Sequence, residues 1–472
     1  MTRRCVVLLL ANLFAVSAAW AQASGPQQPA AQTFTFTLAQ ALQYALEHYP
    51  SVRSALEQVN VTTANVSVAK AAYLPRLDTL WQTNRATANN IFGQLLPQSV
   101  IPAISGPVLP SASSDTAWGT AVGGLLSWEP FDFGLRGAAV QEAEAGVVRS
   151  RAEETLTRLA VQNAVSTAFL AVVSAQQSVA AAEADSARRG TLARAAQTLA
   201  DNQLRPGAEA SRAAAERAAA DTRVIQARQA LTIAQARLAQ FLGIPEGTVT
   251  VSTAGLLDRL TEGTPPTPSS QHPLLQSGQA AVDLARAHES VLASTFRPRV
   301  YLQSSVFARG TGANLDGDFD GGASGLGLER ANWAAGVQVV FPNLFDFESV
   351  RARRAAAGAA TRAESARYDE AALMLSNQRR TADAMVAAAR AIAQNTPIQL
   401  AAARQSETQA RARYDAGLAS IVEVADAQNL LTQAEYQDAA ARVDVWRALL
   451  TQAVASGDLA AFAELLRLSR VP

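Results

Sequence analysis

The spacing of apolar residues predicts a chain dominated by long helices. Steps of four and three residues between apolar positions are typical of helices that pack in a coiled coil. Such steps connect Ala220, Val224, Ala227, Leu231, Ala234, Leu238 and Phe241. In the C-terminal part alanine recurs at every seventh position, at Ala427, Ala434, Ala441 and Ala448. Because small residues let helices approach closely, we expect alanine-rich helix pairs.

One segment between the helices alternates like a β-strand. From Trp118 to Trp128 it has 11 residues, the length that a tilted strand needs to cross a bilayer. One face carries Trp118, Thr120, Val122, Leu126 and Trp128. Tryptophan at both ends of a face resembles the aromatic girdles of membrane β-barrels. The alternative is an ordinary half-buried strand with two large residues.

The same series of landmarks occurs twice along the chain. It consists of a helical stretch between two prolines, a tryptophan and a Phe-Asp-Phe triplet. These stand at Pro50–Pro75, Trp118 and Phe131–Phe133, and again at Pro273–Pro298, Trp333 and Phe345–Phe347. Corresponding positions are 223, 215 and 214 residues apart. The sequence therefore predicts a tandem duplication with small gaps in its loops.

Capping residues and prolines suggest the boundaries of the elements. Thr37 and Gln40 form a capping box for the first helix, and Pro50 is a point of interruption. We expect Pro130 to stop a return strand. Asp132 and Asp346 are suited to N-cap the long helices.

These signals divide the chain into five parts. The first part, 1–21, is a signal peptide, and the first repeat, 22–243, has a β-hairpin at 77–128 and long helices at 133–242. A proline-rich connector at 244–271 precedes the second repeat, 272–456, with a hairpin at 299–341 and long helices at 347–455. A tail, 457–472, ends the chain.

The N-terminus has the pattern of a secretory signal. Two arginines precede the apolar run Cys5–Ala19, and Ala19-Trp20-Ala21 fits an A-x-A cleavage site, with Ala21-Gln22-Ala23 as an alternative. Cleavage would remove Cys5, the single cysteine. We therefore expect a mature chain without disulfides and without a lipid on an N-terminal cysteine.

Charge and composition exclude several other functions. The chain has 40 basic and 40 acidic side chains without a basic tract, so nucleic acid is not an expected partner. Lys70 is the only lysine and follows Ala69, which excludes a Walker A loop. After the signal no run of 18 apolar residues occurs, so we expect no transmembrane helix. A membrane β-barrel needs no such run.

Two loop motifs fall short of functional sites. The loop that begins at Asp316-Gly317-Asp318 resembles a calcium loop, but its twelfth position is Gly327 and not the required glutamate. The segment Gly322–Leu326 lacks the last glycine of a nucleophile elbow. We therefore predict a protein that is not an enzyme and has no cofactor or metal site, with cation binding by the Asp316–Asp320 loop as the alternative.

Three segments together resemble the TolC family of outer-membrane efflux proteins. They are the first helix from Thr37 to Pro50, the junction Trp128–Gly134 and, most specifically, Tyr414–Asp426. The last segment contains a Tyr-x-x-Gly turn, a small hydroxyl residue and an alternation of hydrophobic and acidic residues. The resemblance extends over nearly the whole mature chain.

The resemblance implies a mainly α fold with a membrane β-barrel part. Each protomer of a homotrimer would give four strands to one 12-stranded barrel in the outer membrane, above an α-helical barrel that crosses the periplasm. Closure across three chains would remove the unpaired strand edges, which lipid does not tolerate. Trp118, Trp128 and Trp333 would lie at the membrane interfaces.

The resemblance also implies the exit duct of a tripartite efflux or type I secretion system. Its partners would be a periplasmic adaptor protein, an inner-membrane transporter and outer-membrane lipid. The adaptor would dock on the hairpin tips, at Leu204, Arg205, Pro206, Gly207, Gly417, Leu418, Ala419 and Ser420. The alternative is a secreted or periplasmic structural helical bundle that binds partners without spanning a membrane.

A gate at the periplasmic entrance is a further implication. Glu423 and Asp426 match the acidic positions that narrow this entrance in the family and bind cations, and Tyr414 belongs to the adjoining turn. The family pattern has a latching arginine two residues after the turn glycine, where this chain has Ala419. We therefore expect Arg212 to supply a replacement cation near Glu423.

Overall fold

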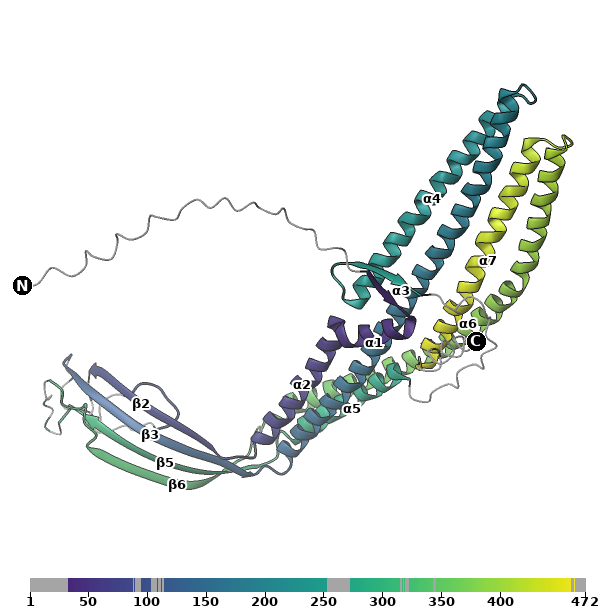
Figure 1. Cartoon of the computed structure of the whole chain (residues 1–472). Helices are drawn as coiled ribbons and strands as arrows, with labels where there is room; N and C mark the ends of the chain where they lie inside the picture. The colour runs from purple at the N-terminus through teal and green to yellow at the C-terminus, as the bar shows by residue number, and fades with distance from the viewer. Residues whose placement is uncertain are drawn as a thin grey trace, which may run out of the picture.

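A computed structural model describes residues 33–87, 89, 95–102, 108, 112, 114–252, 272–314, 316, 318, 322–342, 345–459 and 462. The expected signal peptide, most of the connector and most of the tail lie outside these residues. A four-stranded sheet occupies one end of the molecule, and two long helical hairpins extend to the other end (Figure 1).

The elements follow the duplicated plan. The first half contains β1 (Thr33–Phe36), α1 (Leu38–His48), α2 (Pro50–Ala71), β2 (Arg76–Thr87), β3 (Thr116–Phe131), α3 (Leu135–Asp201) and α4 (Gly207–Leu242). The second half contains β4 (Thr248–Val251), α5 (Pro273–Ser294), β5 (Arg299–Thr311), β6 (Arg330–Val340), α6 (Phe347–Asp415) and α7 (Ile421–Ser456). The order helix, hairpin, long helix, helix occurs in both halves and confirms the duplication.

The starts of the first helices follow the capping signals. The hydroxyl of Thr37 accepts a hydrogen bond from the backbone N–H of Gln40, whose side chain accepts one from the backbone N–H of Thr37. Pro50 stands at the first position of α2 and separates it from α1, because proline fits the first turn of a helix but not its interior. The predicted interruption is therefore confirmed.

The junction between β3 and α3 differs from the prediction. Pro130 does not stop the strand, which runs to Phe131 with a register irregularity after Trp128; a strand proline is tolerated at such a bulge. The helix begins at Leu135, but the Asp132 carboxylate still accepts hydrogen bonds from the backbone N–H groups of Gly134 and Arg136. Asp132 therefore caps α3 from outside its first turn.

The second long helix is capped more weakly. Asp346 stands directly before α6, as expected, but its side chain forms no cap hydrogen bond to the backbone. Its carboxylate instead accepts a hydrogen bond from the hydroxyl of Ser349. The two halves therefore share the capping residue but not its contact.

The strands form two sheets. The large sheet is antiparallel, in the order β2-β3-β5-β6, and β1 pairs in parallel with β4. The small sheet connects the start of the first repeat to the segment after α4. Within the large sheet β2 and β6 are the edge strands.

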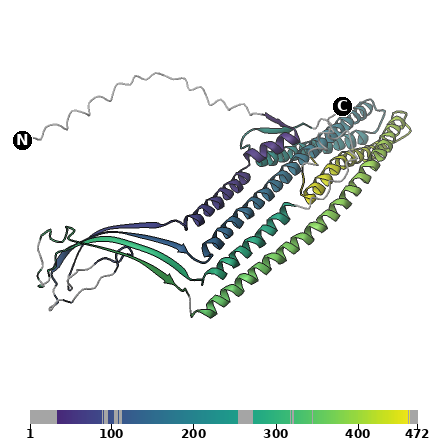
Figure 2. The ribbon, with the colours of Figure 1, turned by 90° about the horizontal axis from the view of Figure 1, so that it is seen from below.

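Beside the sheet α2, α3, α5 and α6 lie side by side in one layer (Figure 2). Beside the sheet α3 contacts α2 and α5, and toward the far end it contacts α4 and α7. With 67 residues, α3 is about 100 Å long at 1.5 Å per residue. It therefore extends through most of the helical part of the chain.

The main hydrophobic core lies midway along the helices, where α1, α3, α4 and α7 meet. Phe169 of α3 and Trp446 of α7 are fully buried in it. Among the described helices, α3 alone is long and apolar enough to span a membrane by composition. Its apolar residues Val165, Leu170 and Val173 belong to this core, so the packing of the chain accounts for them.

Candidate functional site

One face of the large sheet is apolar and exposed. The strand register places Trp81 opposite Val122 and Val306 opposite Trp333, and the two tryptophans are 76% and 78% exposed. The same face carries the exposed side chains of Leu77, Leu126, Trp128, Leu302, Val337 and Val339. Exposed apolar surface this extensive marks an interaction with a partner or a membrane.

The opposite face of the sheet is mainly polar. It carries Asp78, Gln82, Asn84, Ser127, Gln303, Ser305, Arg309, Arg330, Asn332 and Gln338. Alternation of apolar and polar residues along each strand is the pattern of a barrel with lipid outside and water inside.

The tryptophans predicted for the membrane interfaces share the apolar face. Trp128, at the helix end of β3, donates a hydrogen bond from its Nε1 to the carbonyl oxygen of Tyr73 at 3.0 Å. Trp118 lies near the loop end, with the Arg85 guanidinium 5.7 Å from its ring. Polar contacts at the edge of an apolar ring suit an interfacial position. The sequence analysis did not identify Trp81. The signal was present, because Leu77 and Trp81 are an even number of positions apart and so share one face of a strand, as Trp118 and Trp128 do.

The α3–α4 and α6–α7 turns meet at the far end of the molecule through Arg205, Glu209 and Tyr414, which we call the tip latch. The hydroxyl of Tyr414 donates to Glu209 Oε2 at 3.3 Å. The Arg205 guanidinium lies 5.1 Å from the Tyr414 ring and 3.8 Å from Glu209 Oε1, and it donates to the Tyr414 carbonyl oxygen at 3.5 Å. The contacts of Tyr414 with Arg205 and Glu209 link residues about two hundred positions apart.

The tip latch rests on a small hydrophobic cluster. Leu192 of α3 and Ile421 and Val424 of α7 belong to the same buried cluster as Tyr414. Burial, together with the negative charge of Glu209, raises the pKa of the Tyr414 phenol. The phenol therefore stays protonated and keeps its role as a donor at neutral pH.

The predicted gate carboxylates are on the exposed side of α7. Glu423 Oε2 lies 3.8 Å from Arg413 Nη2, and both side chains are more than half exposed. Asp426 is exposed and forms no ion pair with another described residue of the chain. Arg212 is exposed on α4, and Arg413 rather than Arg212 is the cation beside Glu423. A role for Arg212 would require contact between chains and stays a prediction.

The predicted docking tips contain two exposed leucines. Leu204 in the α3–α4 turn and Leu418 in the α6–α7 turn are both exposed. Gly417 has a φ of +76°, a left-handed conformation that favours glycine. Ala419 is buried in the hydrophobic cluster beneath the latch, so it does not present its side chain to a partner.

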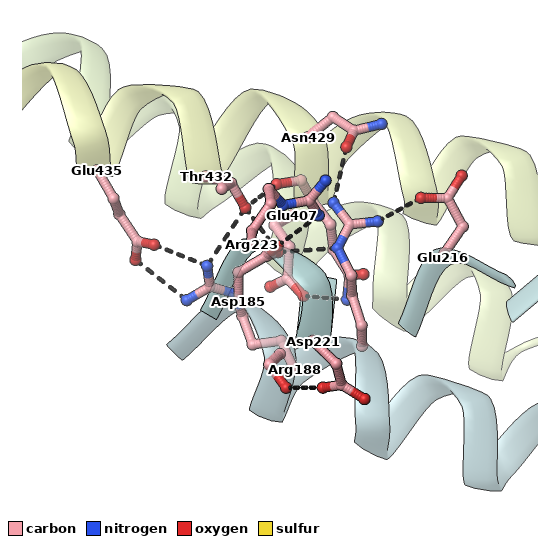
Figure 3. Close-up of polar contacts among 12 residues, drawn as sticks. Asp185, Arg188, Glu216, Asp221, Arg223, Glu407, Asn429, Thr432 and Glu435 are labelled. Atoms are coloured by element: carbon pink, nitrogen blue, oxygen red, sulfur yellow. Dashed lines mark hydrogen bonds and ion pairs between the residues drawn. The ribbon is translucent and has the colours of Figure 1, made fainter. Parts of the chain in front are cut away.

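A buried polar network joins α3, α4 and α7 farther from the tips (Figure 3). We call its six residues, Asp185, Arg189, Glu216, Arg223, Asn429 and Thr432, the polar clamp. Arg189, only 2% exposed, donates to Asp185 Oδ1 at 2.9 Å, to Glu216 Oε2 at 2.7 Å and to Asn429 Oδ1 at 2.7 Å. One guanidinium therefore binds all three helices.

Asp185 is the second centre of the polar clamp and is 1% exposed. It accepts hydrogen bonds from Thr432 Oγ1 at 2.7 Å and from Arg223 Nη2 at 2.8 Å. Burial alone would raise the pKa of the Asp185 carboxyl, but these bonds and the charge of Arg189 outweigh it and lower the pKa. The carboxylate is therefore ionised at neutral pH.

A bidentate ion pair between Arg188 and Glu435 lies beside the polar clamp. Arg188 donates to the two carboxylate oxygens of Glu435 at 3.1 and 2.7 Å. Sequence analysis found neither the polar clamp nor this pair. The only local signal was Asp185 and Arg189 at a spacing of four, which exposed helix pairs such as Arg149 and Glu153 also show.

Comparisons with known proteins agree with this geometry. The family model for outer membrane efflux proteins matches residues 41–244 and 269–457. The comparison with curated protein sequences found no match.

Several solved channel structures have a similar fold. The CmeC outer membrane channel of Campylobacter jejuni aligns with a TM-score of 0.72 and 15% identity, over 92% of this chain and 89% of that chain. VceC from Vibrio cholerae aligns with a TM-score of 0.69 and 17% identity, over 89% and 96%. The outer-membrane channel OprN aligns with a TM-score of 0.67 and 18% identity, over 89% of both chains. The chain therefore belongs to the outer membrane efflux protein family and is a protein of the outer membrane.

Proposed function

We propose that this protein is the exit duct of a tripartite efflux or type I secretion system. Substrate would pass from an inner-membrane transporter through the periplasm to the outside. The observation that supports this most strongly is the division of the chain into a sheet with one exposed apolar face and long helical hairpins that extend away from it. Such a molecule spans two environments.

The sheet supports a homotrimer. Its edge strands β2 and β6 have unpaired backbone groups on their outer sides, which the hydrocarbon core of a membrane does not tolerate. Pairing of β6 of one chain with β2 of the next would close the barrel. Three chains of four strands then give the 12 strands implied by the family resemblance. The apolar face would contact lipid, and the polar face would line the lumen.

The helical end supports a gate. In a trimer, three copies of Glu423 and Asp426 would surround the axis, and their negative charge would favour cations over anions. The tip latch would hold the α6–α7 hairpin of each chain inward in the closed state. Outward movement of this hairpin would break the contacts of Tyr414 with Arg205 and Glu209 and widen the entrance.

A periplasmic adaptor would dock on the tips of the two hairpins. The exposed Leu204 and Leu418 offer apolar anchors there, and Arg205 and Pro206 border the first of them. Energy would come from the inner-membrane transporter. The duct itself would perform no chemistry.

Conductance of the purified protein in a planar bilayer tests this proposal. We expect a small, cation-selective conductance that rises in the double variant Glu423→Ala/Asp426→Ala. A conductance that is the same with and without these substitutions would support the channel but contradict the assignment of Glu423 and Asp426 to the gate. A protein that is soluble without detergent and shows no conductance would favour the alternative, a structural helical bundle.

A further inference from the structure

The polar face of the sheet carries one apolar patch. Leu80, Ala121, Leu125 and Phe307 form it, and they share a face with Gln82, Ser127 and Arg309. The exposure of these apolar side chains to water in the middle of a polar lumen would be energetically unfavourable. Part of the connection between β2 and β3, residues 95–102, covers this patch. We call these residues the inward segment.

The inward segment packs closely on the patch. Val100 is 8% exposed and Ile101 is 2% exposed, and both belong to the same hydrophobic cluster as Ala121 and Phe307. A side chain built on Gly123 would place its Cβ 2.8 Å from the Cβ of Phe307 and 3.2 Å from Cγ1 of Ile101. The absence of a side chain at Gly123 therefore makes room for Ile101 against the strand.

The inward segment also has its own internal hydrogen bonds. The side-chain oxygen of Gln98 accepts from the backbone N–H of Val100 at 2.6 Å and of Ile101 at 2.7 Å. The side-chain nitrogen of Gln98 donates to the carbonyl oxygen of Ile101 at 2.7 Å. These three bonds form a turn that presents Val100 and Ile101 to the sheet together.

The contact lies deep within the strands. β3 begins at Thr116, at the end of the sheet farthest from the helices, and Gly123 is seven residues further along. At about 3.3 Å per residue this is on the order of 23 Å from the loop end of the strand. Instead of projecting away from the sheet, the chain returns toward its middle on the polar face.

An open hollow remains between the inward segment and the other hairpin. It has a volume of about 520 Å³ and is lined by Ser99, Val100, Pro102, Gln303, Ser305 and Gln338, among others. The inward segment thus narrows the space over the polar face without filling it.

We propose that the inward segment forms a second constriction of the duct, inside the barrel, and that Val100 and Ile101 are the positioning residues that hold it against the sheet. The inference rests on the proposed function, because the polar face lines a lumen only in a closed trimer. Three copies would surround the axis and limit the size of solutes that pass between the barrel and the outside. This constriction lies at the opposite end of the molecule from the tip latch.

Labelling of a single thiol from the outside tests this constriction without passage through the periplasmic entrance. Ser127→Cys places the thiol on the polar face near the helix end of β3, below the inward segment. The single natural cysteine is Cys5, in the expected signal. Intact cells are treated with a small membrane-impermeant maleimide or with the same maleimide on a polyethylene glycol chain.

The comparison uses Ser127→Cys alone and with Ile101→Asp. A buried unpaired carboxylate on the apolar patch is unfavourable, so the inward segment should leave the sheet. We expect the large reagent to label about tenfold faster in the double variant, while the small reagent changes much less. Leu96→Asp is the matched control, because Leu96 belongs to the same segment and is 54% exposed.

Gln98→Ala provides a second variant in case Ile101→Asp does not assemble. It removes the three hydrogen bonds of the turn and keeps the apolar side chains, so we expect a smaller increase in the same direction. Equal rates for the large reagent with and without Ile101→Asp would overturn the second constriction. A thiol that neither reagent reaches from outside in any variant would contradict the duct itself, and the second constriction with it.

Discussion

The tip latch and the polar clamp both connect the first helical hairpin to the second, but their contacts differ in strength. The hydrogen bonds and the ion pair of the tip latch are 3.3 to 3.8 Å long, and the latch lies beside the exposed leucines of the turns. The polar clamp has hydrogen bonds of 2.7 to 2.9 Å around two side chains that are almost fully buried.

The difference indicates where the hairpins can separate. Charge-assisted hydrogen bonds are stronger when they are short and shielded from water, so the polar clamp should hold α3, α4 and α7 together. The tip latch should exchange more readily, because its contacts are long and partly open to solvent. We therefore expect opening movements to occur between the polar clamp and the tips, with the clamp as their fixed point.

The largest expected effect is on stability at the polar clamp. Arg189→Met would leave Glu216 and Asn429 without their donor and would remove one of the cations beside the buried Asp185. Breaking a buried ion pair from one side costs about 3–5 kcal/mol, and thermal unfolding followed by circular dichroism measures the loss. Arg194→Met is the matched control, because Arg194 is exposed on the same helix. Equal losses in both variants would contradict a special role for the clamp.

The tip latch should affect gating more than stability. Tyr414→Phe removes the hydrogen bond to Glu209 and keeps the ring beside Arg205. One hydrogen bond contributes about 1 kcal/mol, so we expect a small loss of stability and a clear rise in the conductance of single channels. An unchanged conductance would show that the Tyr414–Glu209 contact does not hold the entrance closed.

Acid should weaken the polar clamp specifically. The pKa of the Asp185 carboxyl lies below its ordinary value in the folded chain, so ionised Asp185 favours the folded state. This contribution is present above about pH 4 and is lost as the pH falls through the lowered folded-state pKa. Unfolding measured between neutral and acidic pH should show a steeper loss in the parent than in Asp185→Asn. Parallel curves would contradict this assignment.

Base should weaken the tip latch instead. The pKa of the Tyr414 phenol is raised, first by burial and then by Glu209, so the folded state favours the protonated phenol. Its contribution is present below about pH 10 and is lost as the pH rises through the raised pKa. Conductance of the parent should therefore increase in strong base, whereas Tyr414→Phe should lack this increase. The same alkaline increase in both proteins would assign it to other groups.

The smallest expected effect concerns the exposed pair of Arg413 and Glu423. Exposed ion pairs contribute about 0–1 kcal/mol, so Arg413→Ala should hardly change stability. It should increase cation selectivity, because Glu423 loses its nearby positive charge. Arg212→Ala distinguishes a pair within one chain from a pair between chains. A larger selectivity change in Arg212→Ala would place the operative contact between protomers.

Local signals predicted much of the fold correctly. The capping box of Thr37 and Gln40, the helix start at Pro50 and the alternation from Trp118 to Trp128 depend only on neighbouring residues. The duplicated order of elements was equally visible, because each half repeats its own local pattern. The prediction at Pro130 was wrong, because the irregular pairing of β3 with β5 accommodates a proline that would stop a regular strand.

The sequence by itself determined the helices, the strands, their repetition and the family, since these follow from spacing along the chain. Only the tertiary structure decided which polar residues are buried together. An aspartate and an arginine four residues apart look the same in the buried pair of Asp185 and Arg189 as on an exposed helix face. The partners of Tyr414 lie about two hundred residues away in the sequence. Ile101 packs beside Gly123 and Phe307, which belong to two different strands. Such contacts depend on packing between distant segments, which periodicity does not encode.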